Sequence, residues 1–184
     1  MKSQIKHLII TTLCIAGMSL PTFSTPGATH ATEKESIHWI SIEKAMELNK
    51  TNPKKIYIDF YTDWCGWCKK MDRDCFTDPK VISEMNKDYY AVKFNAETKD
   101  KVLFHDVTYN FSIQNGANEF ALSMLDGQLS YPTAVILSET QQKITMVPGY
   151  QKASFLVEIL SYFGNNIHLK LSWDDYEKSL GHKS

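Results

Sequence analysis

The chain has 184 residues, with 20 Lys and Arg against 21 Asp and Glu, and a formal net charge of −1 at pH 7. This length is typical of one globular domain with extensions, large enough to bury a proper hydrophobic core. The near-zero net charge and the lack of like-charge runs argue against nucleic acid or another polyelectrolyte as a partner.

The N-terminal segment has the layout of a secretory signal peptide. Lysines precede an apolar run from Leu8 to Leu20, which is too short for a comfortable membrane span and is followed by Pro21 and small residues. We predict a signal peptide over residues 1–31, with cleavage between residues 24 and 31. An uncleaved N-terminal anchor is the alternative. A cleaved signal peptide implies that the mature protein is exported, and the predicted compartment is the periplasm.

Three elements are predicted before the most informative motif. A flexible leader over residues 32–36 precedes a short strand over 37–40. Ser41 is a candidate N-cap for a helix that runs to about Leu48, because its hydroxyl can accept a backbone N–H of the first turn. Residues 55–61 are mostly β-branched and aromatic, which predicts a buried strand.

The motif Trp-Cys-Gly-Trp-Cys-Lys at residues 64–69 lies where this strand passes into a helix. The position places the sulfur of Cys65 at the helix N-terminus, where free N–H groups and the helix dipole favour a thiolate. We expect this sulfur to be partly exposed, with the charge of Lys69 nearby. Cys68 lies on the same side of the first turn and can close a short disulfide. The pair therefore suits thiol–disulfide exchange.

The rest of the chain alternates helices and strands. Asp78 is a candidate N-cap with Pro79 at the first helical position. Beyond this helix we predict a strand at 89–94, a helix near 118–125, strands at 133–137 and 143–147 joined as a hairpin, an amphipathic helix at 153–163 and a short helix opened by a capping box at 172–175. Residues 99–116 are not assigned to an element.

These residues resemble the thioredoxin superfamily. Residues 57–69 are similar to its active-site strand and helix, although Trp67 stands where thioredoxin has proline. Residues 92–95 resemble the third strand of the family, and Tyr131-Pro-Thr133 resembles its cis-proline turn. The similarity covers residues 37–164, and the stretch after the motif is closer to exported thioredoxin-related domains.

The resemblance implies an α/β fold, a thioredoxin-like three-layer α/β/α sandwich with a central mixed sheet. We therefore predict a thioredoxin-like domain over residues 37–164 with an enlarged segment at 97–130. A C-terminal extension with a short helix follows over residues 165–184.

The resemblance also implies roles for individual residues. Cys65 is the candidate nucleophile and Cys68 the candidate resolving thiol of a redox disulfide. Asp59 matches the buried acid that assists deprotonation of the resolving cysteine, and Lys93 matches the lysine that pairs with this acid. The predicted substrate contacts are Trp64, Gly66, Trp67, Tyr131 and Pro132, with Pro132 in the cis form.

Other readings of these residues remain open. A C-x-x-C pair also occurs in zinc sites, but zinc needs two further ligands and the sequence offers no second pair of this kind. Asp59 would have no role below the dithiol if strand alternation pointed it outward. Cys75 is too far along the helix to bridge to Cys68, and we interpret it as a core thiol.

The predicted function is that of an exported thiol–disulfide oxidoreductase that reduces protein disulfides through Cys65 and Cys68, as a monomer without cofactor or metal. Protein disulfides are the expected substrates, and a membrane thiol carrier is the expected electron donor. Two alternatives remain: an isomerase or oxidase that uses the same dithiol, and a non-catalytic binding or chaperone module that keeps the motif as a structural disulfide.

Overall fold

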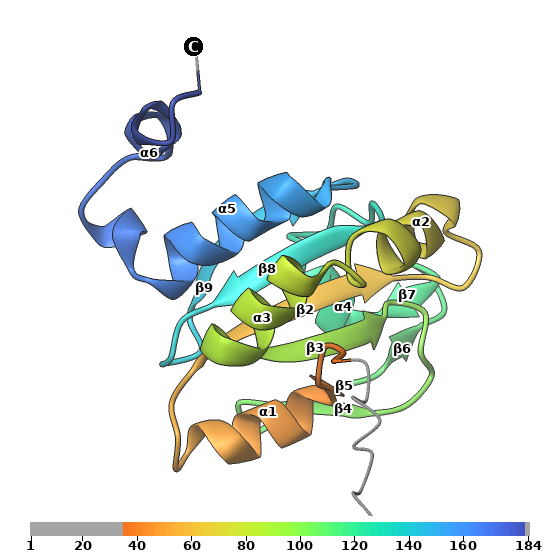
Figure 1. The fold of residues 1–184 in the computed structure, drawn as a ribbon. Helices are drawn as coiled ribbons and strands as arrows, with labels where there is room; N and C mark the ends of the chain where they lie inside the picture. Colours follow the sequence, from red (N-terminus) through yellow and green to blue (C-terminus); the bar gives the residue numbers. More distant parts are fainter. Residues whose placement is uncertain (1–34, 183–184) are drawn as a thin grey trace, which may run out of the picture. The chain divides into compact units, whose positions relative to one another are not determined.

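The computed structural model describes residues 35–182, so the predicted signal peptide lies outside the described residues (Figure 1). The helices are α1 Ile42–Asn49, α2 Gly66–Asp74, α3 Pro79–Asp88, α4 Glu119–Met124, α5 Ala153–Gly164 and α6 Trp173–Ser179, with a short 3-10 helix, η1, at Ile167–Leu169. The strands are β1 Trp39–Ile40, β2 Lys55–Tyr61, β3 Tyr89–Asn95, β4 Val102–Phe104, β5 Val107–Tyr109, β6 Phe111–Ser112, β7 Ala117–Asn118, β8 Thr133–Leu137 and β9 Lys143–Pro148.

A five-stranded mixed sheet forms the middle layer, in the order β1-β3-β2-β8-β9. β3 runs parallel to both β1 and β2, whereas β8 is antiparallel to β2 and β9 is antiparallel to β8. Helices α2, α3 and α5 cover one face of the sheet, and α1 and α4 cover the other. The predicted α/β/α sandwich with a mixed sheet is therefore confirmed.

The helices begin where their caps predict. The Ser41 hydroxyl accepts the backbone N–H of Lys44 at the start of α1, at 3.1 Å. The Asp78 carboxylate accepts the N–H of Lys80 at 2.8 Å, with Pro79 in the first turn of α3. These side chains satisfy backbone donors that have no partner within the helix. The positions of these two helices could thus be predicted from local sequence.

The enlarged segment contains two small hairpins before α4, in the stretch that the sequence left unassigned. The turn between β4 and β5 consists of His105 and Asp106, both with positive φ (48° and 61°). A two-residue turn of this kind usually contains Asn-Gly or Asp-Gly, so the pair His-Asp did not predict a hairpin here. Phe104 and Tyr109 of this hairpin pack against Phe120 of α4, which anchors the segment to the core.

The C-terminal extension packs on α5 through aromatic side chains. Trp173, the first residue of α6, contacts the rings of Phe155 and Tyr162, with centroids 5.6 and 5.0 Å apart. Tyr162 is buried, whereas Phe155 and Phe163, which the amphipathic pattern of residues 153–163 also places among the apolar positions, are only half-buried. The difference arises because α6 covers the side of α5 that carries Tyr162.

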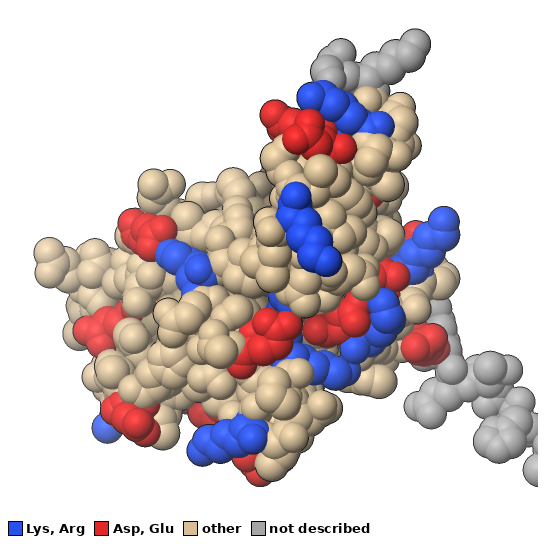
Figure 2. All heavy atoms as spheres, turned by 90° about the vertical axis from the view of Figure 1, so that its left-hand side faces the viewer, with Lys and Arg blue, Asp and Glu red and all other residues tan. Residues whose placement is uncertain are grey.

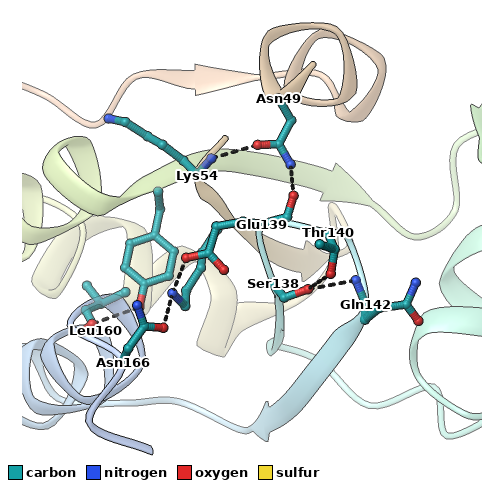
Figure 3. Close-up of polar contacts among 10 residues, drawn as sticks. Asn49, Lys54, Ser138, Glu139, Thr140, Gln142, Leu160 and Asn166 are labelled. Atoms are coloured by element: carbon teal, nitrogen blue, oxygen red, sulfur yellow. Dashed lines mark hydrogen bonds and ion pairs between the residues drawn. The ribbon is translucent and has the colours of Figure 1, made fainter. Parts of the chain in front are cut away.

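A polar cluster lies at the start of β2, at the opposite end of this strand from the Cys-x-x-Cys motif (Figure 3). The buried ammonium of Lys55 donates to Glu139 Oε1 at 2.6 Å and to Asn166 Oδ1 at 2.8 Å. Asn49 Nδ2 donates to the carbonyl oxygen of Glu139 at 3.0 Å, and Asn49 Oδ1 accepts the N–H of Lys54 at 2.7 Å. These contacts offset the cost of burying the charge and join the C-terminal extension to the sheet.

The surface carries charges of both signs. Figure 2 shows the face on the left-hand side of Figure 1, where Lys and Arg lie among Asp and Glu instead of gathering by sign. This mixed pattern agrees with the net charge of −1. Within residues 35–182, no helix has the length and apolar character needed to span a membrane.

Candidate active site

The two cysteines of the motif form a disulfide at the start of α2. Cys65 is the N-cap residue of this helix, and its backbone N–H donates to the carbonyl oxygen of Thr62 in the turn after β2. Its sulfur is bonded to that of Cys68, and the two Cα atoms are 5.3 Å apart. Cys65 Sγ also accepts the backbone N–H of Cys68 at 3.0 Å. The sulfur therefore lies where a helix N-terminus can stabilise negative charge.

The exposure of Cys65 differs from the prediction. Cys68 is 2% exposed, as expected for the inner face of the helix, but Cys65 is only 4% exposed. The expectation of a partly exposed Cys65 is thus wrong for the oxidised form. The bond to the inner sulfur and the hydrogen bond from the Cys68 N–H hold Cys65 Sγ close to the helix.

Exposed indoles flank this recessed disulfide. Trp64 is 67% exposed and Trp67 is 59% exposed, so both predicted contact residues lie at the surface. Each indole packs against a tyrosine: Trp64 against Tyr131, with ring centroids 6.1 Å apart, and Trp67 against Tyr150, at 5.5 Å. Gly66 between them is also exposed.

A cis peptide bond joins Tyr131 and Pro132, as the resemblance implies. The carbonyl oxygen of Pro132 accepts the N–H of Gly149 at 2.8 Å, which holds this turn beside the end of β9. Burial and the nearby charge of Glu97 raise the pKa of Tyr131 to about 12. Tyr131 is therefore neutral at physiological pH, with a half-buried ring beside Trp64.

Asp59 lies inside the sheet, on the face covered by α2. It pairs in register with Lys93 of β3 and with Ala134 of β8, and it is 1% exposed. The alternative in which Asp59 points outward is thus wrong. Lys93 Nζ donates to Asp59 Oδ2 at 3.0 Å, whereas Asp59 Oδ1 has no hydrogen-bond partner. Burial raises the pKa of Asp59 in spite of the opposing effect of the Lys93 charge.

Lys93 connects the buried carboxyl to helix α2. Its ammonium also pairs with Asp72 of α2, and it lies 5.0–5.2 Å from the ring centroids of Trp39, Tyr61 and Phe76. Asp72 was not predicted as a site residue, although its spacing of four residues from Cys68 places both on one helix face. The buried carboxyl of Asp59 is therefore linked to the helix that carries the dithiol.

Glu97 is the second site residue that the sequence did not reveal. Its carboxylate accepts the indole N–H of Trp64 at 2.9 Å. Its backbone N–H donates to Asn95 Oδ1 at 2.9 Å, which fixes the residue at the end of β3. The contact orients an exposed aromatic ring, and only the folded chain brings the two residues together.

Cys75 is a buried free thiol at the C-cap of α2, as predicted. Burial, followed by the charges of Asp78 and Asp59, raises its pKa to about 12. A thiol with this pKa is almost entirely protonated at neutral pH and is a poor nucleophile.

We expect Cys75→Ala to leave dithiol turnover nearly unchanged and to lower the free energy of unfolding by about 1 kcal/mol, because a small buried group is lost. Turnover with a disulfide substrate and urea denaturation measure the two effects. A large loss of turnover in a variant that remains folded would mean that Cys75 takes part in exchange.

The described part of the chain holds no group of three or more His, Cys, Asp or Glu side chains that could bind a metal ion. The zinc alternative therefore gains no support from these residues.

Comparisons with known proteins show which family this chain is similar to. The model of the thioredoxin-like domain family matches residues 42–164. The thiol:disulfide interchange protein DsbD of Tatumella citrea is 28% identical over 138 residues, which are 72% of this chain and 21% of that protein. DsbD of Pectobacterium atrosepticum is 26% identical over 134 residues, 71% of this chain and 20% of that protein. The chain thus matches about a fifth of the length of these relatives.

Solved structures show the same fold at low sequence identity. A thioredoxin-fold protein from Helicobacter pylori has a TM-score of 0.53 and 18% identity, over 71% of this chain and 81% of that one. A thioredoxin from Thermus thermophilus has a TM-score of 0.53 and 16% identity, over 73% of this chain and 89% of that one.

The disulfide starts the first helix after a central strand, on the sheet face that also holds a buried acid, and the neighbouring Trp64 packs against the tyrosine of a cis-proline turn. These features define a protein of the thiol–disulfide oxidoreductase class. The chain belongs to the thioredoxin-like domain family.

Proposed function

We propose that this thiol–disulfide oxidoreductase is exported and reduces protein disulfides, with Cys65 as nucleophile and Cys68 as resolving thiol. The observation that carries the proposal is the Cys65–Cys68 disulfide at a helix N-terminus, on the sheet face that also holds the buried carboxyl of Asp59.

In the reduced protein, the Cys65 thiolate attacks one sulfur of a client disulfide. A bond forms between Cys65 Sγ and that sulfur, and the other client sulfur leaves as a thiolate. Cys68 then attacks Cys65 Sγ, which releases the second client thiolate and restores the Cys65–Cys68 disulfide. Two electrons pass to the client, and its two thiolates take up protons from the surroundings.

Asp59 accepts the proton that Cys68 must lose before it attacks. A carboxyl with a raised pKa is suited to this task. The rise brings its pKa closer to that of a thiol, which makes it a better proton acceptor than an ordinary carboxylate. Lys93 pairs with Asp59 and opposes this rise, so the pair sets the proton affinity of the acid.

The client segment contacts the surface around the disulfide. We assign Trp64, Gly66 and Trp67 to the side formed by the motif, and Tyr131 and Pro132 to the facing turn. The backbone of Tyr131 pairs with the extended client, as the resemblance to the family implies.

The proposed direction is reduction. The helix N-terminus stabilises the Cys65 thiolate only moderately, and the segment between the cysteines contains no histidine. The Asp59 carboxylate opposes a second negative charge on the same face. Both effects favour the disulfide form, so the reduced protein gives its electrons away. The relatives named thiol:disulfide interchange proteins are consistent with exchange chemistry.

An exported reductant has no access to cytosolic electron donors. The N-terminal sequence supports export, with the periplasm as the compartment. We therefore propose a membrane thiol carrier as the donor that reduces Cys65–Cys68 after each cycle.

The redox potential of the Cys65–Cys68 couple tests the direction. Equilibration with a glutathione buffer is expected to give a value near or below about −220 mV, within or below the glutaredoxin range. A value near that of the oxidant DsbA, about −120 mV, would contradict reduction and favour the oxidase alternative. Insulin reduction by dithiothreitol tests catalysis itself, because a binding module would not accelerate it.

A further inference from the structure

An apolar groove runs along the free edge of the sheet. It lies between β9, α5 and the first residue of α6, with a volume of about 370 Å³. Figure 1 shows where β9, α5 and α6 lie in the fold. Most of its lining is apolar, and the residues that matter most here are Val147, Pro148, Phe155, Ile159, Tyr162 and Trp173. This volume lies within the usual range for ligand-binding clefts and has room for a few side chains.

The strand that borders this groove is the last of the sheet. β9 pairs with β8 on one side, and no strand in residues 35–182 pairs with its other edge. Val147 and Thr145 lie opposite Ala134 and Ile136 of β8, so they share the sheet face that α5 covers. An unpaired strand edge beside an apolar cleft is a surface that extended peptides can bind.

One end of the groove adjoins Tyr150, whose ring contacts the Cys-x-x-Cys motif. Two of its lining residues, Pro148 and Gln151, flank the segment Gly149-Tyr150. Tyr150 packs against Trp67, which lies between the two cysteines, with ring centroids 5.5 Å apart. Lys70 of α2 also lies over the Tyr150 ring, at 5.3 Å from its centroid. The surface is thus continuous from the motif, over Trp67 and Tyr150, to the edge of β9.

The chemistry of exchange determines what can occupy this surface. In the mixed disulfide, the client cysteine is covalently bonded to Cys65, so the residues on either side of it must pass over the neighbouring surface. One direction leads over Trp64 and Tyr131, and the other leads over Trp67 and Tyr150 towards the groove.

We propose that the groove binds an extended apolar segment of the client protein, on one side of its reactive cysteine. This inference rests on the proposed reduction of protein disulfides and adds the kind of client that is preferred. Four groove residues of β9, Thr145 to Pro148, span about 10 Å, which matches three or four extended residues of a client. The client residues that enter are therefore those beyond the ones that cross Trp67 and Tyr150.

The proposal also gives the C-terminal extension a role. Trp173 forms one wall of the groove and is held there by edge contacts with Phe155 and Tyr162. Its ring is half-exposed, so part of its apolar surface is free to contact a client. The extension contributes to client selection without touching the cysteines.

The test uses the fully reduced protein and disulfide-linked dimers of a ten-residue peptide. One peptide has three leucines N-terminal to its cysteine, one has them C-terminal to it, and one has serines at both places. Oxidised glutathione serves as a disulfide without a flanking segment. Only one of the leucine peptides is expected to react faster than the serine peptide, by about tenfold, because the groove lies on one side of Cys65.

Two variants change the groove in different ways. Thr145→Lys places a charge at its rim with little risk to the fold, and Trp173→Ala removes one wall. Each is expected to lower the ratio of leucine to serine rates to about one. The matched control is Leu103→Ala, an exposed apolar residue of β4 far along the chain from the groove, which should keep the tenfold ratio.

Each other outcome overturns the inference in a distinct way. Equal rates for all three peptides, with glutathione disulfide still reduced, would remove the groove from client binding and leave the proposed function intact. No reaction with any disulfide would contradict the proposed function as well. A change in sedimentation of Thr145→Lys, without a change in the rate ratio, would make the groove an interface between two copies of this chain.

Discussion

Cys68→Ser is expected to capture client proteins on Cys65 as stable mixed disulfides, whereas Cys65→Ser captures none. The reason is the order of attack: Cys65 Sγ lies at the N-terminus of α2, where the Cys68 N–H and the helix dipole stabilise its thiolate. Without Cys68, nothing in the motif resolves the bond to the client. Either substitution should lower turnover by more than about a thousandfold, since the two thiols act as a unit. Non-reducing electrophoresis followed by mass spectrometry identifies the captured proteins.

Both variants should be made on a Cys75→Ala background, which removes the remaining thiol of the described residues. The double substitution Cys65→Ser and Cys68→Ser is the matched control, and it should capture nothing. Equal capture by the two single variants would contradict the assigned roles.

Asp59→Ala is expected to stabilise the oxidised protein by about 1–3 kcal/mol at pH 8, the usual cost of a buried polar atom without a hydrogen-bond partner, here Asp59 Oδ1. Asp59 is buried, its Oδ1 atom has no hydrogen-bond partner, and burial raises its pKa. The substitution leaves no orphan cation, because Lys93 keeps its contact with Asp72. Turnover should fall about a hundredfold, since Cys68 loses its proton acceptor.

The stability gain should depend on pH in a defined sense. Because the pKa of Asp59 is raised in the folded state, the unfolded chain ionises first as the pH rises above about 4. Wild type then loses stability until the folded-state pKa is passed, and Asp59→Ala does not. The difference is therefore largest above that pKa and disappears below pH 4. Urea denaturation at several pH values measures it, with the exposed Asp63→Ala as control, expected within about 0.5 kcal/mol of wild type. If Asp59→Ala were less stable than wild type at pH 8, this interpretation would be contradicted.

The elements that could be predicted are those specified by local sequence. The caps Ser41 and Asp78 mark helix starts through hydrogen bonds that span only two or three residues. The strand over residues 55–61 is recognisable from its own composition. The hairpins of the enlarged segment have strands of two or three residues, too short to show a period, and their stability comes from contacts with α4.

The residues of the candidate site likewise fall into two groups: those that local sequence predicts and those that only the folded chain brings to the site. Cys65, Cys68 and the cis-proline turn belong to motifs, and the place of Asp59 in a buried strand was visible in its apolar neighbours. Asp72 and Glu97 reach the site through contacts with residues 21 and 33 positions away in the chain. Only the register of β2 against β3 and the packing of α2 on the sheet create these contacts. The burial of Cys65 likewise depends on the closed disulfide, which a sequence does not display.

The inert Cys75 has a practical consequence for following the redox state in cells. Alkylating reagents react with thiolates, so this thiol resists modification while the protein stays folded and is modified once it unfolds. Of the three cysteines in the described residues, an oxidised sample should thus gain no label when native and one label after denaturation. A reduced sample should gain three after denaturation. The label on Cys75 acts as an internal standard, because it reports complete unfolding in every sample regardless of the redox state of Cys65 and Cys68.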